Sequence, residues 1–367
     1  MVRNQWRIGI GLVMLLIISA FGCERNITTI EEVKQTSVLP AQNCLVCHSD
    51  DDTGIIAAAG QWANSKHASG ETVNHNEEPC TKCHTSEGFV HFADTGGILA
   101  EVENPTAIHC FTCHAPHTSG NFSLRLTEAQ PLMDGESMDL GASNICIACH
   151  QSRQNVNTYI TARERISSSR WGPHHSVQGD MLIGSNGYEY EDFDYDIQTN
   201  HRGPGGGCLD CHFETPNSYY LGGHSFNMAH GEGGEEVYNT AACARCHSDM
   251  EEAEDFNKMF AGGGGIQDSV QTLVSTLQGM LETAGLIAYD DEEGIFLPLG
   301  GVTTSADSAG AVWNWLMAEE DQSHGVHNPR YIVNLLYSSI QFMEGTLGST
   351  AETADLTAEQ RRMFAVN

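Results

Sequence analysis

The pattern of apolar and polar residues divides the chain into three kinds of stretch. Residues 8–20 form an unbroken apolar run, and residues 43–260 show little periodicity of either 3.6 or 2.0 residues. After a glycine run that we expect to be a hinge, residues 268–284, 306–318 and 329–343 carry apolar positions at helical spacing. We therefore predict an irregular middle region and a helical part, residues 261–367, that caps it.

The middle region, residues 43–260, is rich in Gly, Asn, Ser and Thr, which favour turns over long elements. Its apolar side chains are too few to form a conventional core for about two hundred residues. We therefore expect only short helices and little other secondary structure there, and a core supplied by something other than side chains.

The first 22 residues have the layout of a signal peptide. Arg3 and Arg7 precede the apolar run, and Gly22 follows it. Cys23 stands where a bacterial lipobox has its lipidated cysteine, although Ala20 replaces the usual leucine. We expect export with a lipid anchor on Cys23; ordinary cleavage and an uncleaved anchor are the alternatives.

Residues 23–42 are expected to be a linker, and no later stretch is long and apolar enough to span a bilayer. The chain carries 48 acidic against 17 basic side chains, a formal net charge of −31. This charge disfavours nucleic acid and anionic lipid as partners, and suits cationic partners, metal ions or oxidised mineral surfaces. Acidity that merely keeps an exported protein soluble explains the composition equally well.

Six copies of C-x-x-C-H lie in the middle region and contain all but one of the 13 cysteines. At this spacing two thiols attach to the two vinyl groups of a haem, and the adjacent histidine becomes the proximal iron ligand. A zinc knuckle would need cysteine pairs to meet in fours, and a redox dithiol would not need the histidine. We therefore predict six haem c groups, which stack and supply the missing core. In chain order the motifs are motif 1 (Cys44, Cys47 and His48), motif 2 (Cys80, Cys83 and His84), motif 3 (Cys110, Cys113 and His114), motif 4 (Cys146, Cys149 and His150), motif 5 (Cys208, Cys211 and His212) and motif 6 (Cys243, Cys246 and His247).

The chain has 18 histidines, twice as many outside the motifs as in them. A haem with histidine on one face is open to substrate, whereas a haem with histidine on both faces transfers electrons only. The surplus favours the second case. The expected distal ligands are His67, His117, His175, His201, His224 and His327, with His109, His174 and His324 as alternates.

Local context supports these choices. His117 lies three residues after His114, too close to reach the far face of its own haem, so we expect it at a neighbouring haem. His224 follows two glycines, whose bare backbone would let a porphyrin approach closely. His174 and His175 follow a proline, and we prefer His175 of the two.

An acidic and aromatic stretch, residues 188–196, lies between motifs 4 and 5. Its carboxylates alternate as in a calcium-binding loop, but the glycine and the bidentate glutamate of an EF-hand are missing. We expect a solvated acidic loop or a subunit contact.

Several longer runs resemble one family. Residues 82–90, 172–175 and 221–224 are similar to multihaem c-type cytochromes that polymerise into extracellular nanowires. Residues 311–331 resemble the C-terminal helices of the wider superfamily that includes ammonia-forming nitrite reductase. The resemblance implies bis-His haems in one continuous stack, some ligands donated by a neighbouring subunit, and a homopolymer at the outer surface that passes electrons to redox proteins or extracellular acceptors. The lipobox departs from the pattern of the nanowire cytochromes, since a lipid on the N-terminus would tether a subunit and hinder free filament assembly.

The alternative is a nitrite or hydroxylamine reductase with one open haem. The related pentahaem reductases often carry C-x-x-C-K at that haem, whereas all six motifs here end in histidine. The few basic residues also disfavour an anion-binding pocket. A haem store would not explain the surplus histidines. We therefore predict an electron carrier without catalytic residues.

Overall fold

The computed structural model describes residues 53–162, 165–191, 193–202, 207–216, 218–232, 235–250, 256–257 and 264–347. The expected signal peptide, the lipidation site Cys23 and the linker lie outside these ranges. So does motif 1, with its predicted haem-attaching Cys44 and Cys47 and its predicted iron ligand His48. All described residues fall within one compact unit, Leu39–Asn367.

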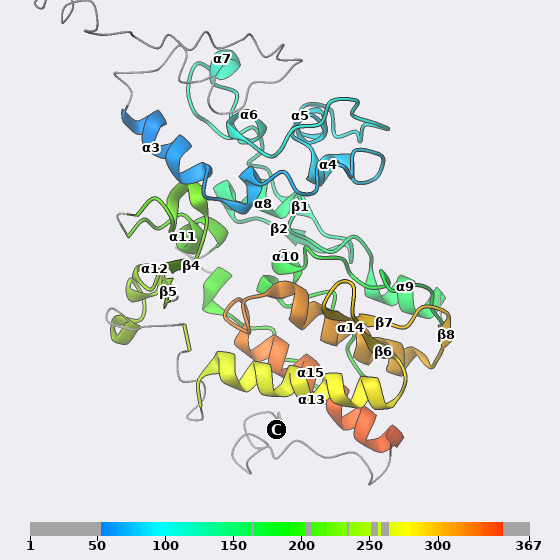
Figure 1. Ribbon diagram of the computed structural model, residues 1–367. Helices are drawn as coiled ribbons and strands as arrows, with labels where there is room; N and C mark the ends of the chain where they lie inside the picture. Colours follow the sequence, from blue (N-terminus) through cyan, green and yellow to red (C-terminus); the bar gives the residue numbers. More distant parts are fainter. Residues whose placement is uncertain are drawn as a thin grey trace, which may run out of the picture. The chain divides into compact units, whose positions relative to one another are not determined.

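Three long helices form the C-terminal part: α13 (Ile266–Thr283), α14 (Ala306–Asp321) and α15 (Pro329–Leu347). They lie side by side and contact one another (Figure 1). Leu273, Leu277 and Leu281 of α13 share one face through their spacing of four residues, and all three are buried. The helices expected from the apolar spacing are thus confirmed.

The core of these helices extends into the segment between motifs 4 and 5. This segment contributes α9 (Val156–Ala162), α10 (Gln178–Ile183) and η4 (Asn200–Arg202). Trp171 packs edge-on against Trp313 of α14, and the Trp313 indole donates a hydrogen bond of 2.8 Å to the Asn186 carbonyl. The helical part therefore shares one core with residues 156–197.

Residues 188–191 and 193–196 are bound to the long helices through their side chains. The Tyr188 hydroxyl donates to Asp307 at 2.7 Å, the Tyr195 hydroxyl bonds to Ser338 at 2.9 Å, and Asp196 pairs with Arg330. The expected solvation holds for the carboxylates of Glu189, Glu191 and Asp194, which are exposed, but not for the aromatic rings, which pack on the helical core. A subunit contact stays a prediction.

Within the described residues, the strands are short and form four two-stranded antiparallel ladders. They are β1 (Gln130–Pro131) with β2 (Ser137–Met138), β3 (Arg165–Ile166) with β8 (Val302–Thr303), β4 (Ala229–Glu232) with β5 (Glu235–Tyr238), and β6 (Ile287–Asp290) with β7 (Ile295–Pro298).

The motif-bearing parts consist of short helices joined by turns, so the predicted mostly irregular and α-helical fold class is confirmed. The motifs lie at α4 (Thr81–His84), α6 (Cys110–Cys113), α8 (Asn144–Ile147), α11 (Cys208–His212) and α12 (Ala241–Ala244). The elements between them are α3 (Thr53–Trp62), η2 (Lys66–Ala68), α5 (Ser86–Thr95), α7 (Pro116–Ser119), η3 (Gly141–Ser143), η5 (Gly223–Ser225) and η6 (Ser248–Met250).

Apolar packing around the motifs is limited to small clusters. Phe89, Leu126, Ile145 and Ala148 form one of them, with three motif cysteines at its edge. The long helices, in contrast, bury a continuous set of apolar side chains. This difference in side-chain packing leaves the motif-bearing parts dependent on a non-protein core.

We predict that a chain exported without haem attachment will be cut rapidly within residues 53–150 and 207–250. Cleavage within α13, α14 and α15 will be slower, because these helices have a side-chain core. Limited proteolysis followed by mass spectrometry measures this, with the haem-loaded chain as control. Native-like resistance of the motif-bearing parts in the haem-free chain would contradict it.

Candidate haem-binding sites

The five described motifs share one local geometry. In motifs 2, 3, 4 and 6 the histidine amide donates to the carbonyl of the first cysteine, at 2.8–3.1 Å, which closes one helical turn. One turn of helix thus presents two thiols and an imidazole together, as covalent attachment of a haem requires.

None of the ten cysteines of these five motifs is in a disulfide bond. Nine of them are partly buried, whereas Cys246 of motif 6 is exposed. A thioether bond at Cys246 would therefore place the edge of the motif 6 haem near the protein surface. Cys44 and Cys47 of motif 1 lie outside the described residues, so their attachment to haem stays a prediction.

Each described motif histidine faces one histidine from a distant part of the chain. An iron between two imidazoles would lie about 2.0 Å from each ligating nitrogen, and each nitrogen lies about 1.1 Å from the centre of its own ring. The two ring centroids would therefore be roughly 6.2 Å apart. The observed centroid separations are 6.1 Å for His84–His174, 6.4 Å for His114–His224, 6.2 Å for His150–His67, 6.3 Å for His212–His327 and 6.3 Å for His247–His201.

Two other histidine pairs are closer and do not fit an iron between them. His75 lies 4.9 Å from His84, and His175 lies 4.8 Å from His174, measured between ring centroids. The His175 ring is exposed and its Nδ1 contacts Glu320 at 2.7 Å. The geometry therefore favours His174 over His175, opposite to the preference drawn from the sequence, because the ring of His174 rather than that of His175 faces His84.

Hydrogen bonds at Nδ1 orient several of these rings. His114, His212 and His201 bond to the carbonyl oxygens of Phe122, Phe226 and Val326, at 2.7, 2.8 and 2.7 Å. A proton held on Nδ1 leaves the lone pair of Nε2 free for a metal.

His150 and His327 make their Nδ1 contacts with side chains. The Nδ1 of His150 bonds to the Gln178 side-chain oxygen at 3.1 Å. The Nδ1 of His327 bonds to the Asp321 carboxylate at 2.6 Å. None of these partners belongs to a recognisable motif, so sequence reasoning missed them.

Burial keeps several of the facing imidazoles neutral. It lowers the pKa of His67 and of His212 to about 4 and that of His174 to about 3. Neutral imidazole is the form that binds metal. At His327 burial would also lower the pKa, but the Asp321 carboxylate outweighs burial and raises it.

The geometry of His109 disfavours iron binding through its Nε2. It is buried and its Nδ1 accepts a hydrogen bond from the Phe111 amide at 3.2 Å, where it caps α6. An imidazole that accepts at Nδ1 carries its proton on Nε2 when neutral, so Nε2 has no free lone pair. His117 and His324, the other candidates without a facing motif histidine, are exposed.

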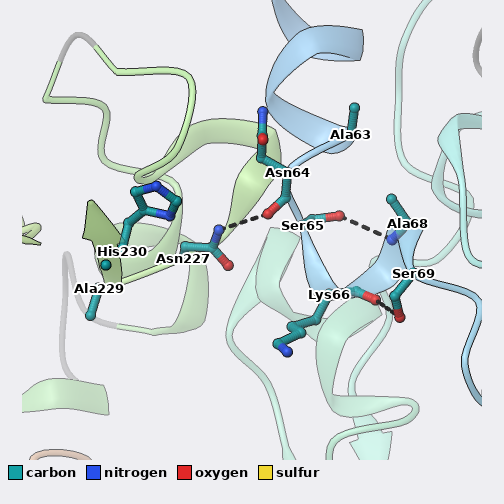
Figure 2. Close-up of a pocket in the computed structure, with 10 residues that line it drawn as sticks. Ala63, Asn64, Ser65, Lys66, Ala68, Ser69, Asn227, Ala229 and His230 are labelled. Carbon is teal, nitrogen blue, oxygen red and sulfur yellow. Dashed lines mark hydrogen bonds between the residues drawn. The ribbon is translucent and has the colours of Figure 1, made fainter. Parts of the chain in front are cut away.

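His67 is held in place by the backbone around η2. The Ser65 hydroxyl accepts from the Ala68 amide at 3.2 Å, and the Asn227 amide group donates to the Asn64 carbonyl at 2.9 Å (Figure 2). Asn64, Ser65, Ala68, Asn227 and His230 line a surface hollow beside it. The His230 ring stacks on Tyr220 at 4.4 Å.

The glycines before His224 serve protein packing. A Cβ on Gly222, whose φ is +60°, would lie 1.6 Å from the Glu214 carbonyl oxygen, and one on Gly223 would meet the side chain of Gln61. The Gln61 side-chain oxygen also accepts from the His224 amide at 3.1 Å. The two glycines are thus required by contacts within the chain, and the expected approach of a porphyrin is not needed to explain them.

Motif 4 is in contact with three other motifs. Cys149 lies beside Cys83 of motif 2, and Cys146 lies beside Cys208 of motif 5. Cys113 of motif 3 packs in the same apolar cluster as Cys146 and Cys149.

Motif 6 adjoins motif 5, since α11 and α12 are in contact. Arg245 within motif 6 lies 3.7 Å from Asp210 and 3.4 Å from Glu214, measured from its Nη1 to a carboxylate oxygen of each. The five described motifs therefore form one connected group with motif 4 at its centre.

Within the described residues, no group of three or more His, Cys, Asp or Glu side chains is arranged to hold a bare metal ion. The same part of the chain contains no helix that is long and apolar enough to cross a membrane.

Comparison with known proteins agrees with the motif chemistry. Residues 20–125 match the family of outer membrane cytochrome MtrC/MtrF-like domains II/IV. The C-type polyheme cytochrome OmcB of Geobacter sulfurreducens is 24% identical over 379 aligned residues, which cover 83% of this chain and 48% of OmcB. OmcC of the same organism is 23% identical, over 75% of this chain and 44% of OmcC.

The chain spans about half the length of these curated relatives. Among solved structures, the outer cell wall cytochrome OcwA matches with a TM-score of 0.46 and 18% identity, over 77% of this chain and 49% of OcwA. The resemblance to multihaem c-type cytochromes indicated by the motifs is confirmed by the sequence matches, and these relatives are polyhaem and outer membrane cytochromes.

Proposed function

We propose that this protein is an electron-transfer cytochrome of the outer cell surface that holds six haem c groups, each between two histidines. The observation that carries the proposal is the set of five facing histidine pairs, all with centroid separations of 6.1–6.4 Å. Haem c supplies one-electron redox chemistry when bound. The chain's own residues fix the spacing of the sites and exclude substrate from the irons.

The pairs define the proposed ligands of motifs 2 to 6, and the cysteines of these motifs, Cys246 included, form the thioether bonds. In motif 1, Cys44 and Cys47 form the thioether bonds and His48 is the proximal ligand. Six distal ligands were preferred from the sequence. Four of them face a motif histidine, and His175 contacts Glu320 instead. We therefore assign the one that is left, His117, as the distal ligand opposite His48. In chain order of the motifs the five described pairs are His84 with His174, His114 with His224, His150 with His67, His212 with His327, and His247 with His201.

The contacts between motif cysteines support a branched electron path. Motif 4 adjoins motifs 2, 3 and 5, and motif 6 is reached through motif 5. Electrons that enter at any one of motifs 2, 3 or 5 would reach the others through motif 4. This arrangement differs from the single continuous stack that the nanowire resemblance implies.

The reductase alternative needs an iron with one open face. In each of motifs 2 to 6 a histidine stands opposite the motif histidine, which blocks that face. The curated relatives are named as polyhaem cytochromes. Both observations favour an electron carrier over an enzyme.

The matched family is one of outer membrane cytochromes, which supports an outer-surface location for this chain. A lipid on Cys23 would tether it there, and its acidic composition suits redox proteins or oxidised extracellular acceptors as partners. The five assigned pairs need no ligand from a second copy. We therefore propose a lipid-tethered relay as the working form. Filament growth through a histidine donated by a neighbouring copy would involve motif 1 alone.

All six haems are expected to be low-spin in the oxidised protein, because each iron has two histidine ligands. Electron paramagnetic resonance of the purified protein measures this, and carbon monoxide added to the reduced protein should bind no haem. A stoichiometric high-spin signal or carbon monoxide binding would overturn the proposed function. Electron microscopy of the same sample should show single copies, and filaments would overturn the tethered relay.

The adjacent histidines offer a matched pair of variants. His174→Ala should convert one of the six haems to high spin, because it removes the ligand opposite His84. His175→Ala should leave all six low-spin, since His175 contacts Glu320 instead. The spin count comes from electron paramagnetic resonance and the covalent haem count from mass spectrometry. The opposite result would return His175 to the ligand position.

A further inference from the structure

Asp321 differs from the other groups that contact the proposed ligands. It is the last residue of α14, and its side chain is only 1% exposed. One of its carboxylate oxygens lies 2.6 Å from the Nδ1 of His327, and the other accepts a hydrogen bond from Ser323. The His327 amide in turn donates to the Ser323 hydroxyl at 3.2 Å, which closes a small network.

The other defined Nδ1 partners of the proposed ligands are neutral. They are the backbone carbonyls of Phe122, Phe226 and Val326 and the side-chain amide of Gln178. Among these partners within the described residues, Asp321 alone brings a full negative charge to a ligand.

A buried carboxylate at this position acts on the iron through the imidazole. It draws the Nδ1 proton toward itself, so the ring becomes a stronger electron donor at Nε2. A stronger donor, and a negative charge poorly screened by water, both stabilise the more positive ferric state over the ferrous state. The same effect is weaker for a carbonyl, because hydrogen bonds to charged acceptors are about twice as strong as those to neutral ones.

We propose that Asp321 tunes the haem site of motif 5 and lowers its reduction potential. Asp321 is a positioning and tuning residue, since it acts through His327. The inference rests on the proposed ligation of motif 5 by His212 and His327. Motif 5 adjoins motifs 4 and 6, so a lowered potential there makes electron transfer from motif 5 to either neighbour more favourable.

The test is a spectroelectrochemical titration of the full haem-loaded protein and its Asp321→Asn variant. Asparagine keeps the shape and a hydrogen-bond acceptor but removes the charge. One of the six potentials should rise, so that at a fixed applied potential the reduced-to-oxidised ratio of that haem increases about tenfold. The g-values of one low-spin signal should shift with it, and the signal should be the one that His327→Ala abolishes.

The neighbouring carboxylate provides the control. Glu320→Gln removes an acidic side chain one residue away, but its partner His175 faces no motif histidine. All six potentials should be unchanged in this variant. An equal rise in both variants would attribute the effect to net charge and would overturn the proposal.

A second variant separates tuning from mere structural support. Ser323→Ala removes the donor that competes for the carboxylate, so Asp321 should act more strongly on His327 and the same potential should fall. Unchanged potentials in a low-spin Asp321→Asn protein would overturn this inference alone, as would conversion of the haem to high spin. A high-spin motif 5 haem in the unmodified protein would instead refute the proposed ligation.

Discussion

An iron held between two imidazoles, as proposed for each described motif, would impose one distance on the chain, about 6.2 Å between ring centres. Each described motif meets it with a histidine that lies far away in sequence. His150 faces His67 across 83 positions, and His212 faces His327 across 115 positions. The apolar clusters of the motif-bearing parts are small, so side-chain packing alone is a weak means of bringing two such histidines together.

The long helices also help to bring histidines together, but they do so through a side-chain core. They have a side-chain core of their own, shared with residues 156–197, and the loop between α14 and α15 leaves that core at a fixed place. This loop contains His327, and its Val326 carbonyl holds the Nδ1 of His201. The loop between α14 and α15 thereby helps to position the proposed distal ligands of both motif 5 and motif 6. A motif-bearing part with little core of its own gains its order from a part that has one.

Much of this arrangement could be predicted from the sequence, because some signals are local. The C-x-x-C-H spacing fits one helical turn, and the periodicity of the last hundred residues was sufficient to locate α13, α14 and α15. The choice between His174 and His175 could not be made in this way, since adjacent residues point in directions set by the backbone. His174 has a φ of +81°, which directs it differently from its neighbour. The sequence-based prediction for residues 188–191 and 193–196 was incomplete for a related reason. Their acidic composition suggested exposure to solvent, whereas their aromatic rings pack on the helices.

Partners of the ligands were the least accessible to sequence reasoning, and they matter most for how electrons move. The proposed ligation by histidine on both faces is the same at the five described sites, so it would not by itself make one site differ from another. Differences in reduction potential would then come in part from what contacts each ligand. Backbone carbonyls and an amide serve motifs 3, 4 and 6, while motif 5 has a carbonyl at His212 and a buried carboxylate at His327. A chain with six nearly identical attachment motifs can therefore acquire direction through a single charged side chain placed at one of them.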